Sequence, residues 1–314
     1  MQSRVIETPD KSQFAAYSIP SDLDPHLPLF VLHHGGGHCA AVWTLCARKL
    51  ASLVPKSSIL AYDCRGHGRT QTVEESDLSL DRLSQDLVSL VHAAYGESGL
   101  PSQIILVGHS LGGAVVVDVA KRRLLPKVIG VCVLDVVEGT AMDSLSHMSA
   151  FLMSRPSRFK TTEEAIEWSL RTNAVKNAES ARISIPPQLK LLRDNDPSGG
   201  YIWRTNLAAS KEFWKGWFQD LSTKFLSCAC ARMLMLASTD RLDKELIVGQ
   251  MQGKFQLVLF NETGHNIHED SSDKVSSALA EFLVRNQPLE IKRFPIPNNP
   301  KSHATSPTTP KDTL

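Results

Sequence analysis

Short runs of apolar residues recur along the first half of the chain, and each ends in glycine or polar residues. Residues 29–32, 58–62 and 104–107 have the length of strands. A continuous apolar run of this length is typical of a strand covered on both faces in a parallel sheet. Segments with helical spacing separate them, such as 80–95, which Ser79 can cap. The alternation predicts an α/β fold, with helices on both faces of a mostly parallel central sheet.

The same patterns place the other elements. Further strands are expected at 4–7, 13–19, 127–134, 232–237 and 256–260, and further helices at 39–53, 111–123, from about 244, and at 273–285. The alternation stops at about 136–229, where the pattern is mainly helical, including 162–171 and 201–225. We therefore expect one domain over residues 1–286 with a mainly helical cap inserted at 136–229. Residues 287–314 are polar and rich in proline, which predicts a disordered tail.

Four of the five tryptophans lie in the expected cap: Trp168, Trp203, Trp214 and Trp217. They have two interpretations. They can form the core of the cap and its contact with the body, or they can form a surface for a protein partner. The sequence favours neither.

A glycine and serine pattern follows the strand expected at 104–107. Gly108-His109-Ser110-Leu111-Gly112 stands between that strand and the helix expected at 111–123. G-x-S-x-G in this context is the nucleophile elbow of the α/β-hydrolase fold, where the serine occupies a strained turn. Side chains at Gly108 and Gly112 would collide with the neighbouring strand and helix. Ser110 is therefore the predicted nucleophile.

A second turn can supply an oxyanion site. His34-Gly35-Gly36-Gly37 follows the strand at 29–32, and its bare backbone can direct an N–H at a developing negative charge. We expect the backbone N–H groups of Gly36 and Leu111 to do so, and the nearby histidines to be structural. Residues 63–68 (DCRGHG) are expected to be scaffold.

A serine nucleophile needs a base, which an acid orients, and in this fold their order along the chain is Ser, acid, His. His265 follows the last strand and is the predicted base, with His268 as the alternative. The acid has two candidates. Asp135 ends the strand at 127–134 and Asp240 follows the strand at 232–237, and the residues alone do not choose between them.

Composition excludes several classes of function. The chain has 314 residues, of which 42% are hydrophobic, and a net charge of +1, so no nucleic-acid partner is expected. No apolar stretch is long enough to span a membrane, and the first residues lack the apolar core of a signal peptide. The six cysteines have no zinc-site spacing. We expect a cytoplasmic or nuclear protein that needs no metal or other cofactor.

Several short sequence segments are more specific for a single family than the elbow pattern is. They are 135–142 (DVVEGTAM), 155–156 (RP), 179–182 (ESAR), 215–218 (KGWF) and 240–255 (DRLDKELIVGQMQGKF). With them the chain resembles the protein phosphatase methylesterase family from about Phe30 to about Leu283, cap included. It departs from the family in a short leader and in a low-complexity insertion that is reduced to 193–200.

The resemblance implies an activity. The family removes the methyl ester from the C-terminal leucine of the type 2A serine/threonine phosphatase catalytic subunit, which would be the partner and substrate. Its catalytic triad falls on Ser110, Asp135 and His265, and so favours Asp135 over Asp240. The implied mechanism passes through an acyl-enzyme on Ser110. The alternatives are a non-catalytic phosphatase-binding protein, and an esterase or thioesterase with another substrate.

Overall fold

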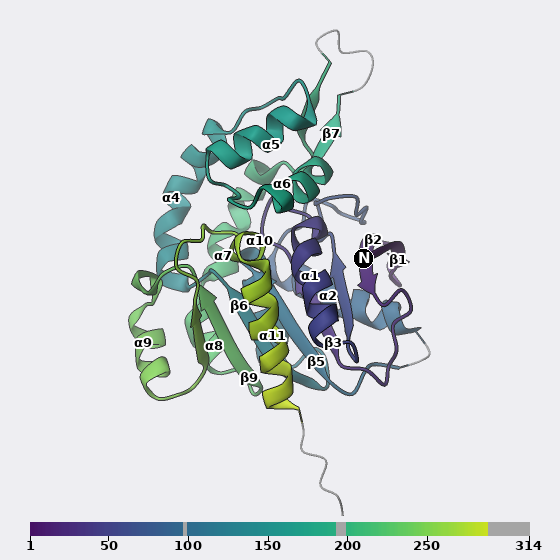
Figure 1. Ribbon diagram of the computed structural model, residues 1–314, viewed down its shortest axis with the longest axis vertical. Helices are drawn as coiled ribbons and strands as arrows, with labels where there is room; N and C mark the ends of the chain where they lie inside the picture. The colour runs from purple at the N-terminus through teal and green to yellow at the C-terminus, as the bar shows by residue number, and fades with distance from the viewer. Residues whose placement is uncertain (97–98, 193–198, 288–314) are drawn as a thin grey trace, which may run out of the picture.

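The computed structural model describes residues 1–96, 99–192 and 199–287, which form a layered α/β structure (Figure 1). Eight strands make the main sheet. Across it they are β1 (Gln2–Glu7), β2 (Gln13–Ile19), β4 (Ser58–Tyr62), β3 (Leu29–His33), β5 (Ile104–His109), β6 (Val128–Leu134), β9 (Ala231–Leu236) and β10 (Gln256–Leu259). Strand β2 pairs antiparallel with β1 and β4, and all the other pairs are parallel. The α/β-hydrolase fold is confirmed.

The central strands are buried on both faces, as their continuous apolar runs predict. Every residue of β3, β4 and β5 is buried. Their side chains alternate between two cores, one on each face of the sheet: Val31 and Leu106 belong to one core, and Leu32 and Val107 to the other.

Helices cover both faces of the sheet. Helices α2 (Leu80–Tyr95) and α3 (Leu111–Arg122) pack on one face, and α1 (Thr44–Leu53) and α11 (Ser272–Asn286) lie side by side on the other (Figure 1). Ser79 caps α2 by accepting a hydrogen bond from the N–H of Arg82, as expected. Helix α9 (Lys244–Met251) lies beyond β9 at the edge of the molecule, next to α8 (Leu221–Leu226). The helix expected at 39–53 starts with a 3-10 turn, Ala40–Trp43.

The segment between β6 and β9 rises above the sheet as a cap (Figure 1). It contains α4 (Glu138–Ser154), α5 (Thr162–Arg171), α6 (Ala178–Ser184), β7 (Leu189–Leu191), β8 (Tyr201–Trp203) and α7 (Trp214–Phe218), with 3-10 turns at Pro186–Gln188 and Leu207–Phe213, and then α8. The helical expectation for 201–225 is wrong at its start, because β8 pairs with β7. This pairing and a bridge from Phe159 to Tyr201 place Trp203 against Phe159 and Trp168 in a small apolar core.

The tryptophans divide into two pairs. Trp214 and Trp217 are 3% and 2% exposed and belong to the main core, where the indole N–H of Trp217 donates to the carbonyl of Leu78. The interpretation of these two as a partner surface is therefore wrong. Trp168 and Trp203 pack on the separate core of the cap.

Two expectations concern the ends and surface of the chain. The tail expected beyond residue 287 lies outside the described residues. Within the described ranges, no helix combines the length and apolar character that a membrane crossing requires.

Candidate active site

The backbone at Ser110 forms a strained turn between β5 and α3. Its φ and ψ are 52° and −119°, a combination that side-chain-bearing residues seldom adopt. A Cβ added to Gly108 would lie 2.1 Å from the carbonyl oxygen of Gly112, and one added to Gly112 would lie 2.4 Å from that of His33. Both positions therefore require glycine, because backbone atoms cannot yield to a side chain. The turn lifts Ser110 to the rim where the parallel strands end.

An aspartate and a histidine from two other strand ends meet beside this turn. Asp135 directly follows β6, and His265 follows β10. The Nδ1 atom of His265 lies 2.8 Å from Oδ2 of Asp135, while Oδ1 accepts a hydrogen bond of 3.0 Å from the N–H of Ala237. The Asp135 side chain is fully buried and that of His265 is 49% exposed. A buried carboxylate thus fixes the ring of a histidine that substrate can reach.

The two alternative residues occupy different places. Asp240 lies on the exposed 3-10 turn Thr239–Arg241, and no bond between it and His265 is present in the described structure. His268 is fully buried, with its ring 4.2 Å from that of Trp43. Burial holds the pKa of His268 well below its usual range. The geometry thus brings Asp135 and His265 together and leaves both alternatives aside.

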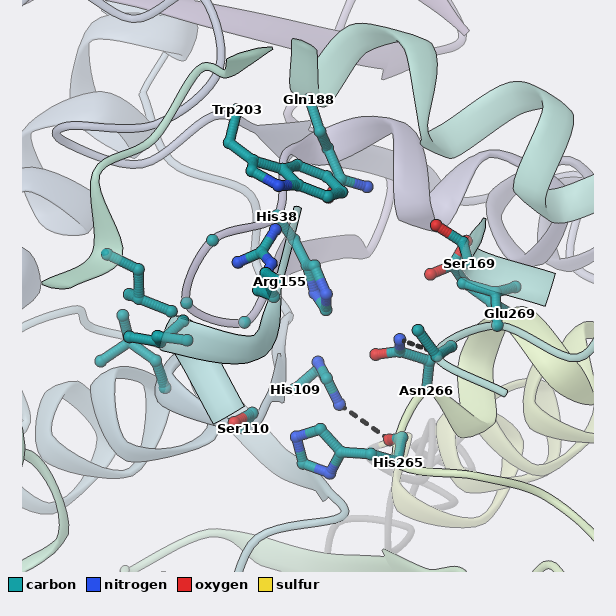
Figure 2. A pocket seen from close by; sticks show the side chains of 18 of the residues that line it. His38, His109, Ser110, Arg155, Ser169, Gln188, Trp203, His265, Asn266 and Glu269 are labelled. Carbon is teal, nitrogen blue, oxygen red and sulfur yellow. Dashed lines mark hydrogen bonds between the residues drawn. The ribbon is translucent and has the colours of Figure 1, made fainter. Parts of the chain in front are cut away.

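Ser110 and His265 lie next to each other at the bottom of a cavity (Figure 2). Among the described contacts, the hydroxyl of Ser110 makes no hydrogen bond to the His265 ring. A general base must come to about 2.6–3.2 Å of its proton donor, a distance often reached only when substrate is bound. Ser110 and His265 both line the cavity, so a bound ester would contact both side chains.

The glycine turn faces the elbow closely. A Cβ at Gly35 would lie 2.7 Å from Nδ1 of His109 and 3.2 Å from Cβ of Ser110. The backbone N–H of Gly37 donates to Nε2 of His67 at 2.8 Å, and this hydrogen bond fixes the turn. Within the described residues, the N–H of Gly36 has no acceptor, and that of Leu111 begins helix α3. Both are free to bind an oxyanion.

The segment 63–68 is scaffold, as expected. Arg65 is fully buried and forms a bidentate ion pair with Asp86, at 2.7 and 2.8 Å. Burial lowers the pKa of His67 to about 4, so the ring stays neutral and its Nδ1–H donates to the carbonyl of Arg65. A neutral ring can accept the Gly37 N–H, and this assigns His67 a supporting role.

Sequence reasoning missed His109, the residue between Gly108 and Ser110. Its Nε2–H donates to the carbonyl of His265 at 2.9 Å, and the two rings are 4.6 Å apart (Figure 2). Burial holds the pKa of His109 well below its usual range, so this ring is a neutral donor. His109 therefore supports the backbone at the proposed base. Its place inside the G-x-S-x-G pattern was the available signal.

The loop that carries His265 is also bound to the cap. We call residues 262–270 the histidine loop. Asp270 accepts the N–H of Gly264 with one oxygen and the N–H of Lys176 with the other, at 2.8 and 2.7 Å. Asn266 donates to the carbonyl of Ala174 at 2.8 Å. Glu269 accepts a hydrogen bond from Ser180 at 2.8 Å. Lys176 also donates from its ammonium group to the carbonyl of Glu262 at 2.8 Å, so the cap is hydrogen-bonded to the histidine loop at four of its described residues.

The cavity above Ser110 has a volume of about 390 Å³ and lies between the cap and the body. Its walls are mainly apolar and include Met148, Leu152, Trp168, Val175, Trp203 and Leu207. Besides His265, the ionisable side chains that line the cavity are His38, His109, Arg155 and Glu269. Burial raises the pKa of Glu269 to about 7. A cavity of this kind fits an apolar group attached to the reacting ester.

Known proteins share the fold of this chain. The model of the alpha/beta hydrolase family matches residues 30–278. The solved structure of E-2-(acetamidomethylene)succinate hydrolase superposes with a TM-score of 0.72 over 90% of this chain and 99% of that one, at 19% identity. This likeness concerns the fold alone.

Closer relatives share the sequence as well. Protein phosphatase methylesterase 1 of Aspergillus oryzae is 47% identical over 82% of this chain and 63% of its own length. The protein of that name from Yarrowia lipolytica is 44% identical over 88% of this chain and 69% of its own length. The one from Bos taurus is 41% identical over 83% of this chain and 78% of its own length. The chain therefore spans just under two thirds of the Aspergillus protein. It belongs to the protein phosphatase methylesterase family of α/β-hydrolases.

Proposed function

We propose that the protein is a serine carboxylesterase that demethylates the C-terminal leucine methyl ester of the type 2A serine/threonine protein phosphatase catalytic subunit. The observation that carries the proposal is the Asp135–His265 pair, 2.8 Å between carboxylate and ring, beside the Ser110 elbow. The name of the relatives supports a phosphatase as substrate. The apolar cavity at Ser110 fits a leucine side chain. We also propose a cytoplasmic or nuclear location.

The mechanism has two acyl-transfer steps. In the first, Ser110 attacks the ester carbonyl while Nε2 of His265 takes the hydroxyl proton, and Asp135 stabilises the imidazolium that forms. The N–H groups of Gly36 and Leu111 hold the oxyanion, and donors of this kind are each worth about 10²–10³-fold in turnover. His265 then gives its proton to the departing methanol. The acyl group remains on Ser110 as an ester.

The second step repeats this chemistry with water. His265 takes a proton from a water molecule, which attacks the acyl-enzyme from the face that methanol has left. A second oxyanion forms at the same N–H groups and collapses to the free leucine carboxylate. Ser110 recovers its proton from His265. The Asp135 carboxylate is itself held in place, because its other oxygen accepts a hydrogen bond from the N–H of Ala237.

A peptide ending in leucine methyl ester tests the proposal. The wild-type protein should release methanol and should react with a fluorophosphonate, which labels activated serines. Ser110→Ala should lose both reactions. Asp240→Asn is the matched control, because Asp240 is exposed and away from His265, and it should retain both. Ester hydrolysis by the alanine variant at the wild-type rate would remove Ser110 from the mechanism.

A further inference from the structure

A cation stands in the wall of the catalytic cavity. Arg155 ends helix α4 and lines the same space as Ser110 and His265. Its side chain is partly buried, and within the described residues no carboxylate pairs with its guanidinium. By contrast, the fully buried Arg65 pairs with Asp86. Arg155 is therefore an unmatched positive charge at the reaction centre.

The guanidinium is fixed in position. Its central carbon lies 3.9 Å from the centroid of the Trp203 ring, which is a cation–π contact. The indole N–H of Trp203 donates at 2.9 Å to the carbonyl of Pro156, the residue after Arg155. In Figure 2, Arg155 lies on the side of Trp203 that faces Ser110. The aromatic ring occupies one face of the guanidinium and leaves its N–H edge available to a ligand.

The guanidinium also lies next to the glycine turn. A Cβ added to Gly37 would lie 3.7 Å from Nη1 of Arg155. Gly37 directly follows Gly36, whose N–H we propose as an oxyanion donor. The positive charge therefore stands close to the place where negative charge develops during ester hydrolysis.

Leaving this charge without a partner is costly. Burial lowers the pKa of Arg155 to about 10, so the group remains cationic near neutral pH. A buried arginine is normally paired with a carboxylate or phosphate, which its planar N–H groups can bind in a bidentate manner. The reacting carboxyl group is uncharged in the methyl ester substrate, but it is an anionic carboxylate in the product. Hydrolysis makes a carboxylate in this cavity.

We propose that Arg155 is the binding residue for the leucine carboxylate that the reaction produces, so that the enzyme holds the demethylated tail more tightly than an uncharged tail. This inference rests on the proposed function, because it takes its ligand from that reaction. Charge-assisted hydrogen bonds of this kind favour a charged ligand by about 10–100-fold. Product release then becomes slower than it would be from a neutral site.

The test compares two labelled peptides without acidic side chains, one ending in a free leucine carboxylate and the other in leucine amide. Fluorescence anisotropy gives their dissociation constants. The wild-type protein should bind the acid about tenfold or more tightly than the amide. Arg155→Gln should abolish this preference, and Arg155→Lys should keep part of it. Arg171→Gln, which removes an exposed arginine of the cap, is the matched control and should keep it fully.

Three outcomes would overturn the inference. They are equal binding of acid and amide by the wild type, an acid preference that survives in Arg155→Gln, and an amide peptide that gains Arg155-dependent affinity from an added aspartate. The last would assign Arg155 to a side-chain carboxylate. Melting curves check that each variant is folded. If Arg155→Gln does not fold, the acid preference of Arg155→Lys is compared with that of the wild type instead. The assay measures binding only, so absence of esterase activity would reject the proposed function separately.

Discussion

At the scale of single residues, backbone position separates two carboxylates that look alike in the sequence. Asp135 has a φ of 50° and directly follows β6, and its own N–H donates to the carbonyl of Met235. This places its side chain between β6 and β9 and under His265. Asp240 stands three residues further from its strand, on the surface. The sequence showed both residues at strand ends but not the turn that directs one of them inward.

This difference predicts unequal effects of one substitution. Asp135→Asn should lower turnover of a leucine methyl ester by about four orders of magnitude, because an amide holds the histidine in the wrong tautomer. Asp240→Asn should change it by less than about threefold, since an exposed surface side chain rarely matters. Steady-state kinetics of the two variants make the comparison. A larger loss in the Asp240 variant would move the acid to the later strand.

Glu269 predicts a pH dependence of stability. Its pKa rises from 4.5 to about 7 by burial, so between these values the folded state holds a proton that the unfolded state releases. Stability from this group is full below about pH 4.5 and is lost as the pH rises to about 7. Glu269→Gln cannot ionise and should raise the melting temperature near pH 8, with no gain near pH 4.5.

The difference between variant and wild type isolates Glu269 from other groups. The buried histidines His38, His109 and His268 have lowered pKa values, so they destabilise the fold at acid pH and act in the opposite sense. They are present in both proteins and cancel in the difference. Equal melting temperatures near pH 8 would show that Glu269 carries no such penalty.

At the scale of elements, strands and helices with a clear period were predictable, and pairings across the chain were not. The strand predicted at 58–62 and the helix predicted at 162–171 match the structure. Burial of one face or both faces of an element gives its consecutive residues a recognisable apolar pattern. The hairpin of β7 and β8 was missed, since three-residue strands are too short to show a period. His109 and Arg155 were missed for another reason. Their partners lie in distant segments.

The two hydrogen bonds that Asp270 accepts, one from the cap and one within the histidine loop, predict a positioning role for this residue. The side chain of Asp270→Asn has one acceptor oxygen in place of two, so it loses the hydrogen bond from the N–H of Gly264 or the one from the N–H of Lys176. We expect turnover of a small activated ester to fall by about ten- to a hundredfold with little change in KM, because the base is misplaced rather than lost. Asp273→Asn, an exposed neighbour, should behave as wild type.

A structural role alone would give a different result. In that case Asp270→Asn would lower the melting temperature and leave kcat of the folded fraction unchanged. The His265 Nδ1 proton gives a second readout, since its hydrogen bond to Asp135 shifts the proton resonance to low field. That resonance should weaken in the Asp270 variant and persist in the Asp273 variant.

At the scale of the whole molecule, the cap stands over the site and restricts what can reach Ser110 (Figure 1). A folded phosphatase cannot enter a cavity of about 390 Å³, so its ester must arrive on an extended tail. Contacts between the two protein bodies can then orient the tail, and binding energy used for orientation raises turnover.

Intact methylated phosphatase should therefore have a specificity constant at least about tenfold above that of a free peptide with the same methylated leucine. Rates of methyl loss from the two substrates, measured under the same conditions, make the comparison. The buried Trp214 and Trp217 are not part of such a docking surface. Equal specificity constants would contradict a contribution from the phosphatase body and leave the chemistry at Ser110 untouched.

If Ser110 demethylates the phosphatase tail by acyl transfer, the oxygen that water supplies must end in the leucine carboxylate. Methylated type 2A phosphatase is incubated with the enzyme in water enriched in heavy oxygen, and mass spectrometry follows its C-terminal peptide. The wild type should remove the methyl group and place heavy oxygen in the leucine carboxylate, while Ser110→Ala should do neither. A methyl group that persists with the wild type, or heavy oxygen found in methanol instead, would contradict this mechanism.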